Sequence, residues 1–197
     1  MKRYINIFVI LLLLKSLVFA EEWNVKKSEN NLMKFTSSTT LLDFDGTTDN
    51  IEGYIYWEGK KLFGEKNEIY FEVDINSIET GIGKRDRDMR EDVLETDKWA
   101  KTSFKGNVKE LKVLDKENQE YELISIGKIK LHGHEKELEI KANVKINDNT
   151  MNVICDFSVF LEDFDIEAPS LLAFVKVAEE IKLHLNFQLE KIVENEN

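Results

Sequence analysis

Apolar and polar residues alternate along most of the chain, which is the pattern of strands with one buried face. The alternation is clearest over Ile69–Ile75, Leu138–Ile146 and Ile181–Leu189. Weaker versions of the pattern cover a short opening stretch and five longer ones: Trp23–Lys27, Leu32–Phe44, Ile51–Glu58, Thr102–Leu114, Tyr121–Leu131 and Met151–Leu161. The sequence therefore predicts an all-β protein of about eight strands.

Residues typical of turns separate these stretches: Asp45-Gly46, Lys105-Gly106, Gly133 and Asn147-Asp148-Asn149. Short connections favour antiparallel pairing of neighbouring strands. Strands with one apolar face must pack against a second sheet or curl into a barrel around their own core. A barrel of eight strands has an interior that holds one small ligand, whereas a closed sandwich has no cavity, and the periodicity is compatible with both.

Two segments depart from the alternation and predict short helices. Between Arg85 and Leu94 the spacing is helical, because Met89 and Val93 lie four residues apart. A second helix is predicted from Ser170 to Glu180, directly after the chain's single proline. Both helices are expected to cap or line an opening of the sheet.

The first twenty residues have the features of a secretory signal peptide. Lys2 and Arg3 precede an apolar run, and small residues before Glu21 fit a cleavage site, so we expect residues 1–20 to be removed and residues 21–197 to form one domain. Lys15 interrupts the run before it reaches the ~20 apolar residues of a spanning helix. The expected location is the periplasm or the exterior of a bacterial cell, with no stable membrane insertion after cleavage.

The acidic balance of the chain disfavours nucleic acid as a partner. The net charge is -11, and loss of three basic residues with the signal peptide would take it to -14. A surface of this sign repels phosphate backbones and anionic lipid headgroups. Acidity that keeps an exported protein soluble explains the charge without any partner.

The sequence contains no convincing catalytic or metal site. Cys155, the single cysteine, lies in an alternating apolar series, so we expect a buried, inert thiol. His132 and His134 flank Gly133 and could share a metal, but an exposed hairpin turn explains them better because no third ligand follows at a fitting spacing. No phosphate loop, dinucleotide fingerprint or nucleophile elbow is present, and we expect neither enzyme activity nor a cofactor.

The stretch Thr80–Arg90, with Val93–Thr96 and Lys98–Phe104 after it, closely resembles the YceI-like family. Leu131-His132-Gly133, Phe164-Asp165-Ile166 and Val177–Ile181 follow in the order of that family. The resemblance covers essentially the whole chain after residue 20. It implies an extended, lipocalin-like antiparallel barrel, commonly a homodimer, whose apolar pore holds a polyisoprenoid, an isoprenoid quinone or a similar long amphiphile.

Under this interpretation, bulky apolar residues supply the ligand-binding surface, and Arg85, Asp86 and Arg90 of the family motif have structural roles. The candidate ligand-binding residues are Phe35, Phe44, Ile55, Trp57, Phe71, Ile75, Met89, Leu94, Trp99, Phe104, Phe157, Phe164, Phe174 and Phe187. Two alternatives remain open. One is a stress-related structural or interaction module whose barrel is filled by side chains, and the other is an enzyme with His132, His134 or Asp86 converging at the barrel mouth.

Overall fold

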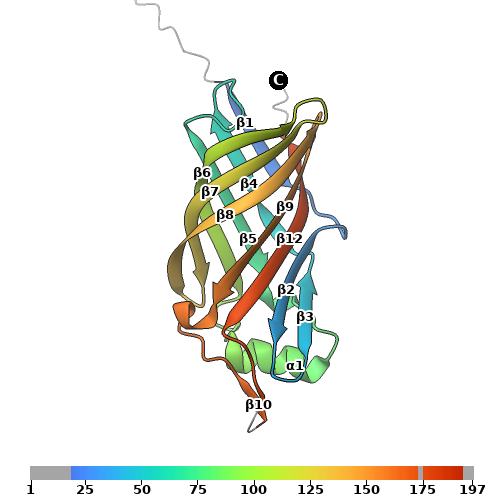
Figure 1. The fold of residues 1–197 in the computed structure, drawn as a ribbon, viewed down its shortest axis with the longest axis vertical. Coiled ribbons are helices and arrows are strands. Elements are labelled where there is room, and N and C mark those ends of the chain that lie inside the picture. Colours follow the sequence, from blue (N-terminus) through green and yellow to red (C-terminus); the bar gives the residue numbers. More distant parts are fainter. Residues whose placement is uncertain (1–18, 173–174, 193–197) are drawn as a thin grey trace, which may run out of the picture.

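Eight antiparallel strands close into a barrel in the computed structural model, which describes residues 19–172 and 175–192. Figure 1 shows a tall cylinder with a short helical segment and a small hairpin at its lower end. The predicted all-β barrel of about eight strands is confirmed. The elements are β1 (Ala20–Val25), β2 (Leu32–Ser38), β3 (Asp43–Thr48), β4 (Ile51–Glu58), β5 (Asn67–Asp74), η1 (Ile75–Ser77), α1 (Gly83–Asp88), η2 (Met89–Val93), β6 (Lys101–Asp115), β7 (Glu120–Leu131), β8 (His134–Asn147), β9 (Thr150–Phe160), η3 (Leu161–Phe164), β10 (Ser170–Leu172), β11 (Val175–Lys176) and β12 (Glu180–Lys191).

Strand β12 closes the barrel, in the order β1-β4-β5-β6-β7-β8-β9-β12 and back to β1. One edge of β12 pairs with β9, and the other pairs with β1 near the upper end and with β2 below it. Buried Asn31 fills the break between β1 and β2. Its side-chain nitrogen donates to the Lys26 carbonyl at 2.8 Å, and its side-chain oxygen accepts from the Gln188 amide at 3.2 Å.

The single strand expected over Leu32–Phe44 is a hairpin of two strands, β2 and β3. Thr39 turns the chain, because its hydroxyl oxygen accepts from the backbone amides of Leu41 and Leu42 at 3.2 and 3.1 Å. The prediction was wrong here because Ser, Thr and Leu continued the pattern of a strand while the threonine hydroxyl satisfied the backbone of a turn.

Two of the four expected turns lie inside strands. Gly46 belongs to β3 and faces Phe35 of β2, and Gly106 belongs to β6 and faces Gly127 of β7. Both glycines mark places where a neighbouring ring or backbone approaches closely, which is the other common reason for glycine in a strand. The turns expected at Gly133 and at 147–149 are confirmed between β7 and β8 and between β8 and β9.

The predicted helix from Ser170 to Glu180 is wrong, since the structure has the small β10–β11 hairpin there. The Val177 amide donates to the Pro169 carbonyl at 3.0 Å, and the Ala178 amide donates to Ser38 of β2 at 2.8 Å. These two amides therefore bond to Pro169 and to Ser38 and not to carbonyls four residues earlier, as they would in a helix. The helix predicted for Arg85–Leu94 is confirmed as the continuous run of α1 and the π-helical η2.

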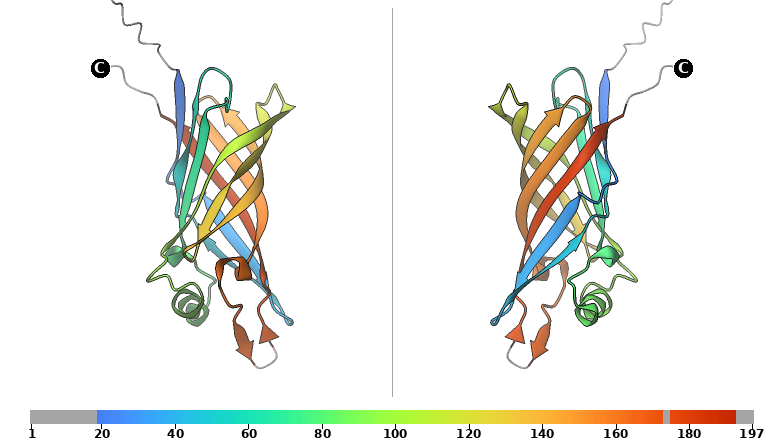
Figure 2. Two further views of the ribbon diagram at one scale, coloured as in Figure 1. Left: turned by 90° about the vertical axis from the view of Figure 1, so that its left-hand side faces the viewer. Right: turned by 90° about the vertical axis from the view of Figure 1, so that its right-hand side faces the viewer.

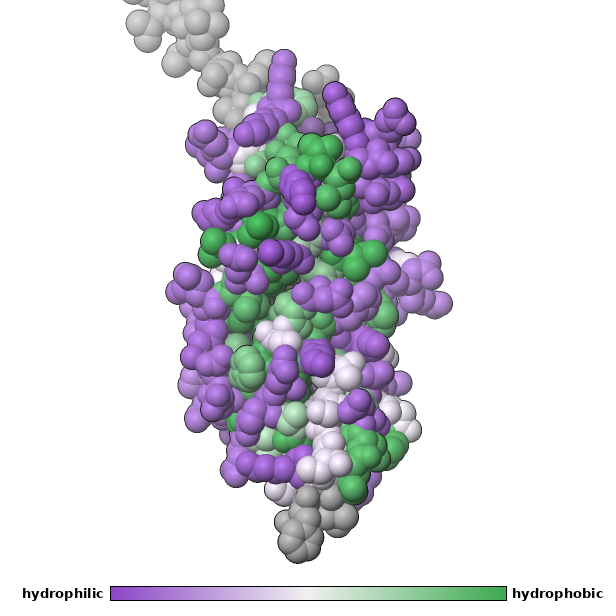
Figure 3. Space-filling view, viewed as in Figure 1, coloured by the Kyte–Doolittle hydropathy of each residue, from purple (hydrophilic) through white to green (hydrophobic). Residues whose placement is uncertain are grey.

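The interior of the barrel has two halves of different character. The upper half is packed with side chains, including Trp23 and Trp57, whose rings stack 6.3 Å apart, and the fully buried Met151 and Leu189. The lower half encloses a cavity. The outer face in Figure 3 carries mostly polar side chains, as the alternation of inward and outward residues requires.

Most of the predicted signal peptide lies outside the described residues, so its cleavage stays a prediction. Phe174, one of the candidate ligand-binding residues, also lies outside them. Within 19–172 and 175–192, no helix combines the length and apolar character needed to cross a membrane.

Candidate functional site: an apolar cavity in the lower barrel

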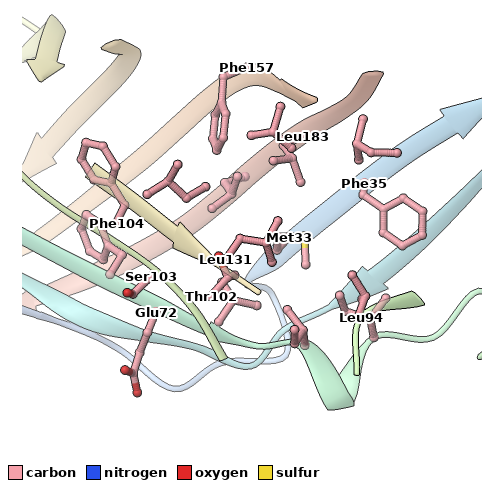
Figure 4. Close-up of a pocket in the computed structure, with 18 of the residues that line it drawn as sticks. Met33, Phe35, Glu72, Leu94, Thr102, Ser103, Phe104, Leu131, Phe157 and Leu183 are labelled. Atoms are coloured by element: carbon pink, nitrogen blue, oxygen red, sulfur yellow. The ribbon is translucent and has the colours of Figure 1, made fainter. Parts of the chain in front are cut away.

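A cavity of about 180 Å³ occupies the lower half of the barrel. Strands β2, β5, β6, β7, β9 and β12 form its wall, and side chains from η1 to the loop after η2 cover one side of it. Figure 4 shows aromatic rings and aliphatic chains pointing into this space. Seven candidate ligand-binding residues line it: Phe35, Phe71, Ile75, Met89, Leu94, Phe104 and Phe157.

Two of the three polar residues at the cavity wall, Glu72 and Thr102, direct their polar atoms to partners outside the cavity. Figure 4 shows the carboxylate of Glu72 turned away from the cavity. That carboxylate accepts a hydrogen bond from the Tyr70 hydroxyl at 2.6 Å and forms an ion pair with Lys101. The bond from Lys101 has the larger effect and the bond from Tyr70 the smaller, and both lower the pKa of Glu72. The Thr102 hydroxyl donates to the Lys130 carbonyl at 2.9 Å. The chemistry offered to a ligand inside the barrel is therefore that of hydrocarbon.

Three candidate residues lie in the packed upper half and do not line the cavity. Ile55, Trp57 and Phe187 are each at least 97% buried. Trp57 packs between Trp23 and Phe63, with ring centroids 6.3 and 5.0 Å away. These residues fill the barrel, so this half matches the alternative of an interior occupied by side chains.

Three more candidates surround the lower end without lining the cavity. Phe44 meets the cavity residue Phe35 edge to face, with centroids 6.1 Å apart. Phe164 is buried in a second apolar cluster beneath the barrel wall, on η3. Trp99 is 37% exposed and covers Gly133, where an added Cβ would lie 2.8 Å from the indole ring.

Ten residues that the sequence analysis did not single out also line the cavity with apolar side chains. They are Met33, Val73, Ile78, Ile129, Leu131, Val159, Leu161, Ile181, Leu183 and Leu185. Most continue the inward-facing series of strands that were correctly predicted. The alternation could have identified them, but the choice of candidates favoured aromatic side chains over aliphatic ones.

The helical segment is fastened beside the cavity by the charged residues of the family motif. Buried Asp86 accepts hydrogen bonds from the Thr80 amide at 2.9 Å and from the Thr80 hydroxyl. The bond from the hydroxyl, with a smaller effect from the bond from the amide, holds the pKa of the Asp86 carboxyl below its usual range. Arg85 donates to the Thr80 hydroxyl and carbonyl oxygens, both at 2.8 Å. Arg90 donates to the Ile78 carbonyl at 2.9 Å. All three side chains tie the helix to residues 78–80.

Arg85 also connects the helix to the β2–β3 hairpin. Its guanidinium lies over the ring of Phe44, 4.7 Å from the centroid, in a cation–π contact. Met89 and Leu94 extend from the same segment to the cavity. Figure 2 shows α1 and the β10–β11 hairpin on different sides of the lower end. The helical segment therefore serves as a fixed cover for part of the cavity.

The histidine turn has the expected position but not the expected exposure. The His132 side chain is only 13% exposed, with Nδ1 3.2 Å from the Phe164 carbonyl and Nε2 3.1 Å from the Glu95 carboxylate. It joins the β7–β8 turn to η3 and to the loop after η2, a role that the polar turn sequence concealed. His134 is exposed to solvent. His132 contacts Phe164 and Glu95, whereas Asp86 contacts Thr80. The three residues of the enzyme alternative therefore share none of these hydrogen-bond partners. Across 19–172 and 175–192, no three His, Cys, Asp or Glu side chains are grouped as metal ligands.

Solved structures share this barrel at low sequence identity. BcnA of Burkholderia cenocepacia has a TM-score of 0.66 at 12% identity, covering 83% of this chain and 98% of its own. A polyisoprenoid binding domain from Saccharophagus degradans has a TM-score of 0.66 at 16% identity, covering 86% and 98%. The YCEI protein of Campylobacter jejuni has a TM-score of 0.54 at 15% identity, covering 76% and 85%.

No curated protein matches the chain by sequence. The model of the YceI-like domain, in contrast, matches residues 23–189, from the first strand of the barrel to its last. That match includes the helical segment and every strand that lines the cavity. The chain therefore belongs to the YceI-like domain family.

Proposed function

We propose that this protein binds a long apolar molecule, such as a polyisoprenoid or the tail of an isoprenoid quinone, in the lower half of the barrel and carries or sequesters it. The observation that supports this most directly is the cavity of about 180 Å³ with hydrocarbon walls. The neighbour from Saccharophagus degradans, a polyisoprenoid binding domain, supports the ligand class. Binding needs no catalytic group.

The size of the cavity sets the scale of the affinity. A space of about 180 Å³ accommodates roughly seven methylene-sized groups, because a cavity of about 150 Å³ binds benzene. At ~0.8 kcal/mol for each buried methylene, they yield ~6 kcal/mol, which is near the lower end of the ~4–15 kcal/mol lost on association. The cavity must therefore widen for tight binding. Met33 and Met89 in its wall are flexible side chains suited to this adjustment.

A matched pair of substitutions tests the site. Val159 lines the cavity, whereas Val113 is 54% exposed on the outer surface. Val159→Phe should fill part of the cavity and reduce uptake of geranylgeraniol, measured by native mass spectrometry, while Val113→Phe should not. Wild-type protein that takes up no apolar chain would overturn the proposal, as would equal uptake by the two variants. If Val159→Phe fails to fold, Leu183→Phe provides the same comparison from β12.

Export is part of the proposal and rests on the N-terminal sequence. A carrier in the periplasm or outside the cell would start near Glu21 after removal of residues 1–20. The intact mass of protein recovered from the periplasm reports the cleavage point, and the native mass spectrum also reports whether the chain is a homodimer. A full-length chain retained in the cytoplasm would contradict export without affecting ligand binding.

A further inference from the structure

Three phenylalanine rings of the cavity wall lie against glycines of neighbouring strands. Phe35 of β2 faces Gly46 of β3, and Phe71 of β5 faces Gly53 of β4. A Cβ added to Gly46 would overlap the Phe35 ring, with Cζ only 2.8 Å away, and a Cβ on Gly53 would lie 2.7 Å from Cδ1 of Phe71. Each glycine thus leaves the space that its partner ring occupies.

The third ring repeats the arrangement on the next strand, since Phe104 of β6 pairs directly with Phe71 of β5. A Cβ on Gly127 of β7 would lie 2.7 Å from Cζ of Phe104 on β6. All three phenylalanines line the cavity. Because protein interiors are close-packed, a ring displaced from its glycine must move into whatever space holds no atoms, and for these rings that space is the cavity. The glycines therefore keep aromatic bulk on the wall and out of the lumen.

We propose that Gly46, through the position of Phe35, sets the width of the cavity and gives it a preference for methyl-branched chains over straight ones. The inference rests on the proposed function, since it concerns the selectivity of the same site. A methyl branch makes a chain wider without making it longer. A lumen in which the Phe35 ring lies against the wall has room for such a branch. If a Cβ at position 46 pushed this ring inward, the branch would no longer fit.

Gly46 is the position where this can be tested without damage to the sheet. Its φ lies outside the left-handed region, and the atoms nearest to its added Cβ belong to the Phe35 ring and, at 3.0 Å, to the Ile78 side chain. Gly53 has φ +140°, so an L-residue there is strained. A Cβ on Gly127 would meet backbone atoms of β6, including the Cα of Gly106 at 2.6 Å.

The experiment compares Gly46→Ala with Gly83→Ala, because a Cβ on Gly83 of α1 meets no atom within 4 Å. Each full-length protein is loaded with an equimolar mixture of phytanol and hexadecanol, saturated alcohols that share a main-chain length and differ in their methyl branches. The extracted ratio of the two alcohols is the readout. In Gly46→Ala we expect the phytanol-to-hexadecanol ratio to fall on the order of tenfold. In Gly83→Ala the ratio should match that of wild type.

A second variant tests the role of the ring itself. Adding Phe35→Leu to Gly46→Ala removes the displaced ring and should restore the wild-type ratio. An unchanged ratio in Gly46→Ala, or no restoration in the double variant, overturns the inference while wild-type binding keeps the proposed function. Wild-type protein that binds neither alcohol refutes the proposed function instead. If Gly46→Ala does not fold, Phe35→Leu alone must not lower the ratio, because it widens the lumen.

Discussion

Phe71 and Phe187 meet edge to face, with ring centroids 4.9 Å apart, where the hollow half of the barrel gives way to the packed half. Phe71 lines the cavity, whereas Phe187 is 97% buried and does not. The pair therefore forms the upper boundary of the cavity. An aromatic ring from β12 therefore limits the depth of the cavity.

Removal of the Phe187 ring should deepen the cavity and weaken the fold. Phe187→Ala is expected to lower the free energy of unfolding by about 3–5 kcal/mol, because a buried aromatic side chain is lost and a void remains. Phe160→Ala is the matched control, since that ring is 45% exposed. Urea denaturation measures both. Similar losses in the two variants would contradict the packed upper half described here.

The buried carboxylate of Asp86 should make stability depend on pH. The bonds from Thr80 lower its folded pKa, so its stabilisation is complete above the unfolded pKa of ~3.9 and is lost as the pH falls through the folded pKa. Asp86→Asn should cost about 1.5–3 kcal/mol at neutral pH, and the difference from wild type should shrink below about pH 4.

The control for this substitution is Asp88→Asn on the same helix. Asp88 pairs with Lys84, and its side chain is 40% exposed, so its loss should cost at most ~1 kcal/mol. Thermal melts of the three proteins across acidic and neutral pH provide the comparison. An Asp86→Asn variant whose deficit is unchanged at low pH would show that the charge of this carboxylate is not what holds the helix.

His132 should hold three segments together at the lower end of the barrel. His132→Ala removes its contacts with the Phe164 carbonyl and with Glu95, and we expect a loss of about 1–3 kcal/mol and faster release of a bound chain. His184→Ala is the control, because His184 contacts only the 74% exposed Asp156 among the polar side chains described. Equal release rates in both variants would rule out a role for His132 in retaining the ligand.

Cys155 should be unreactive until the barrel unfolds. Burial raises the pKa of its thiol to about 12, so almost none is present as the reactive thiolate at pH 8. We expect iodoacetamide to modify the protein rapidly in urea and very slowly in native buffer, as followed by intact mass. Rapid labelling of the native protein would show that β9 opens locally, since Cys155 is 92% buried.

The fold was largely predictable because period-two alternation carries both the strands and the direction of their side chains. The alternation predicted strands β5, β8 and β12 and identified which of their residues face inward. Glycine was the main source of error. Gly46 and Gly106 were assigned to turns, yet each lies in a strand where a ring or backbone comes close. A glycine that permits a turn and a glycine that permits close approach look alike without the partner strand.

The site was only partly predictable for a related reason. Phe71 and Phe187 are both inward-facing aromatic residues in alternating strands, but one borders an empty space and the other fills it. Whether a barrel interior contains a cavity depends on how side chains from different strands pack against one another. The period of the sequence pattern carries no information on that packing. Similarly, the apolar spacing over 170–180 fits a helix, but Ser170 and Leu172 pair with Lys176 and Val175. The Ala178 amide is bonded to Ser38 of β2, so these residues form strands instead.

The strands of the barrel differ in how completely their two edges are paired, and this should set the order in which their amide hydrogens exchange. Along one edge β12 is bonded to β9 over nearly its full length, so its amide hydrogens should exchange with solvent last. In the described part of the chain, β3 is bonded to β2 on one side and, on the other, through the single bridge from Thr47 to Glu79. Side-chain contacts hold the rest of this seam, namely the Thr48–Ser77 hydroxyl bond at 2.6 Å and the Arg85–Phe44 contact, so the amide hydrogens of β3 on this side should exchange before those of β12.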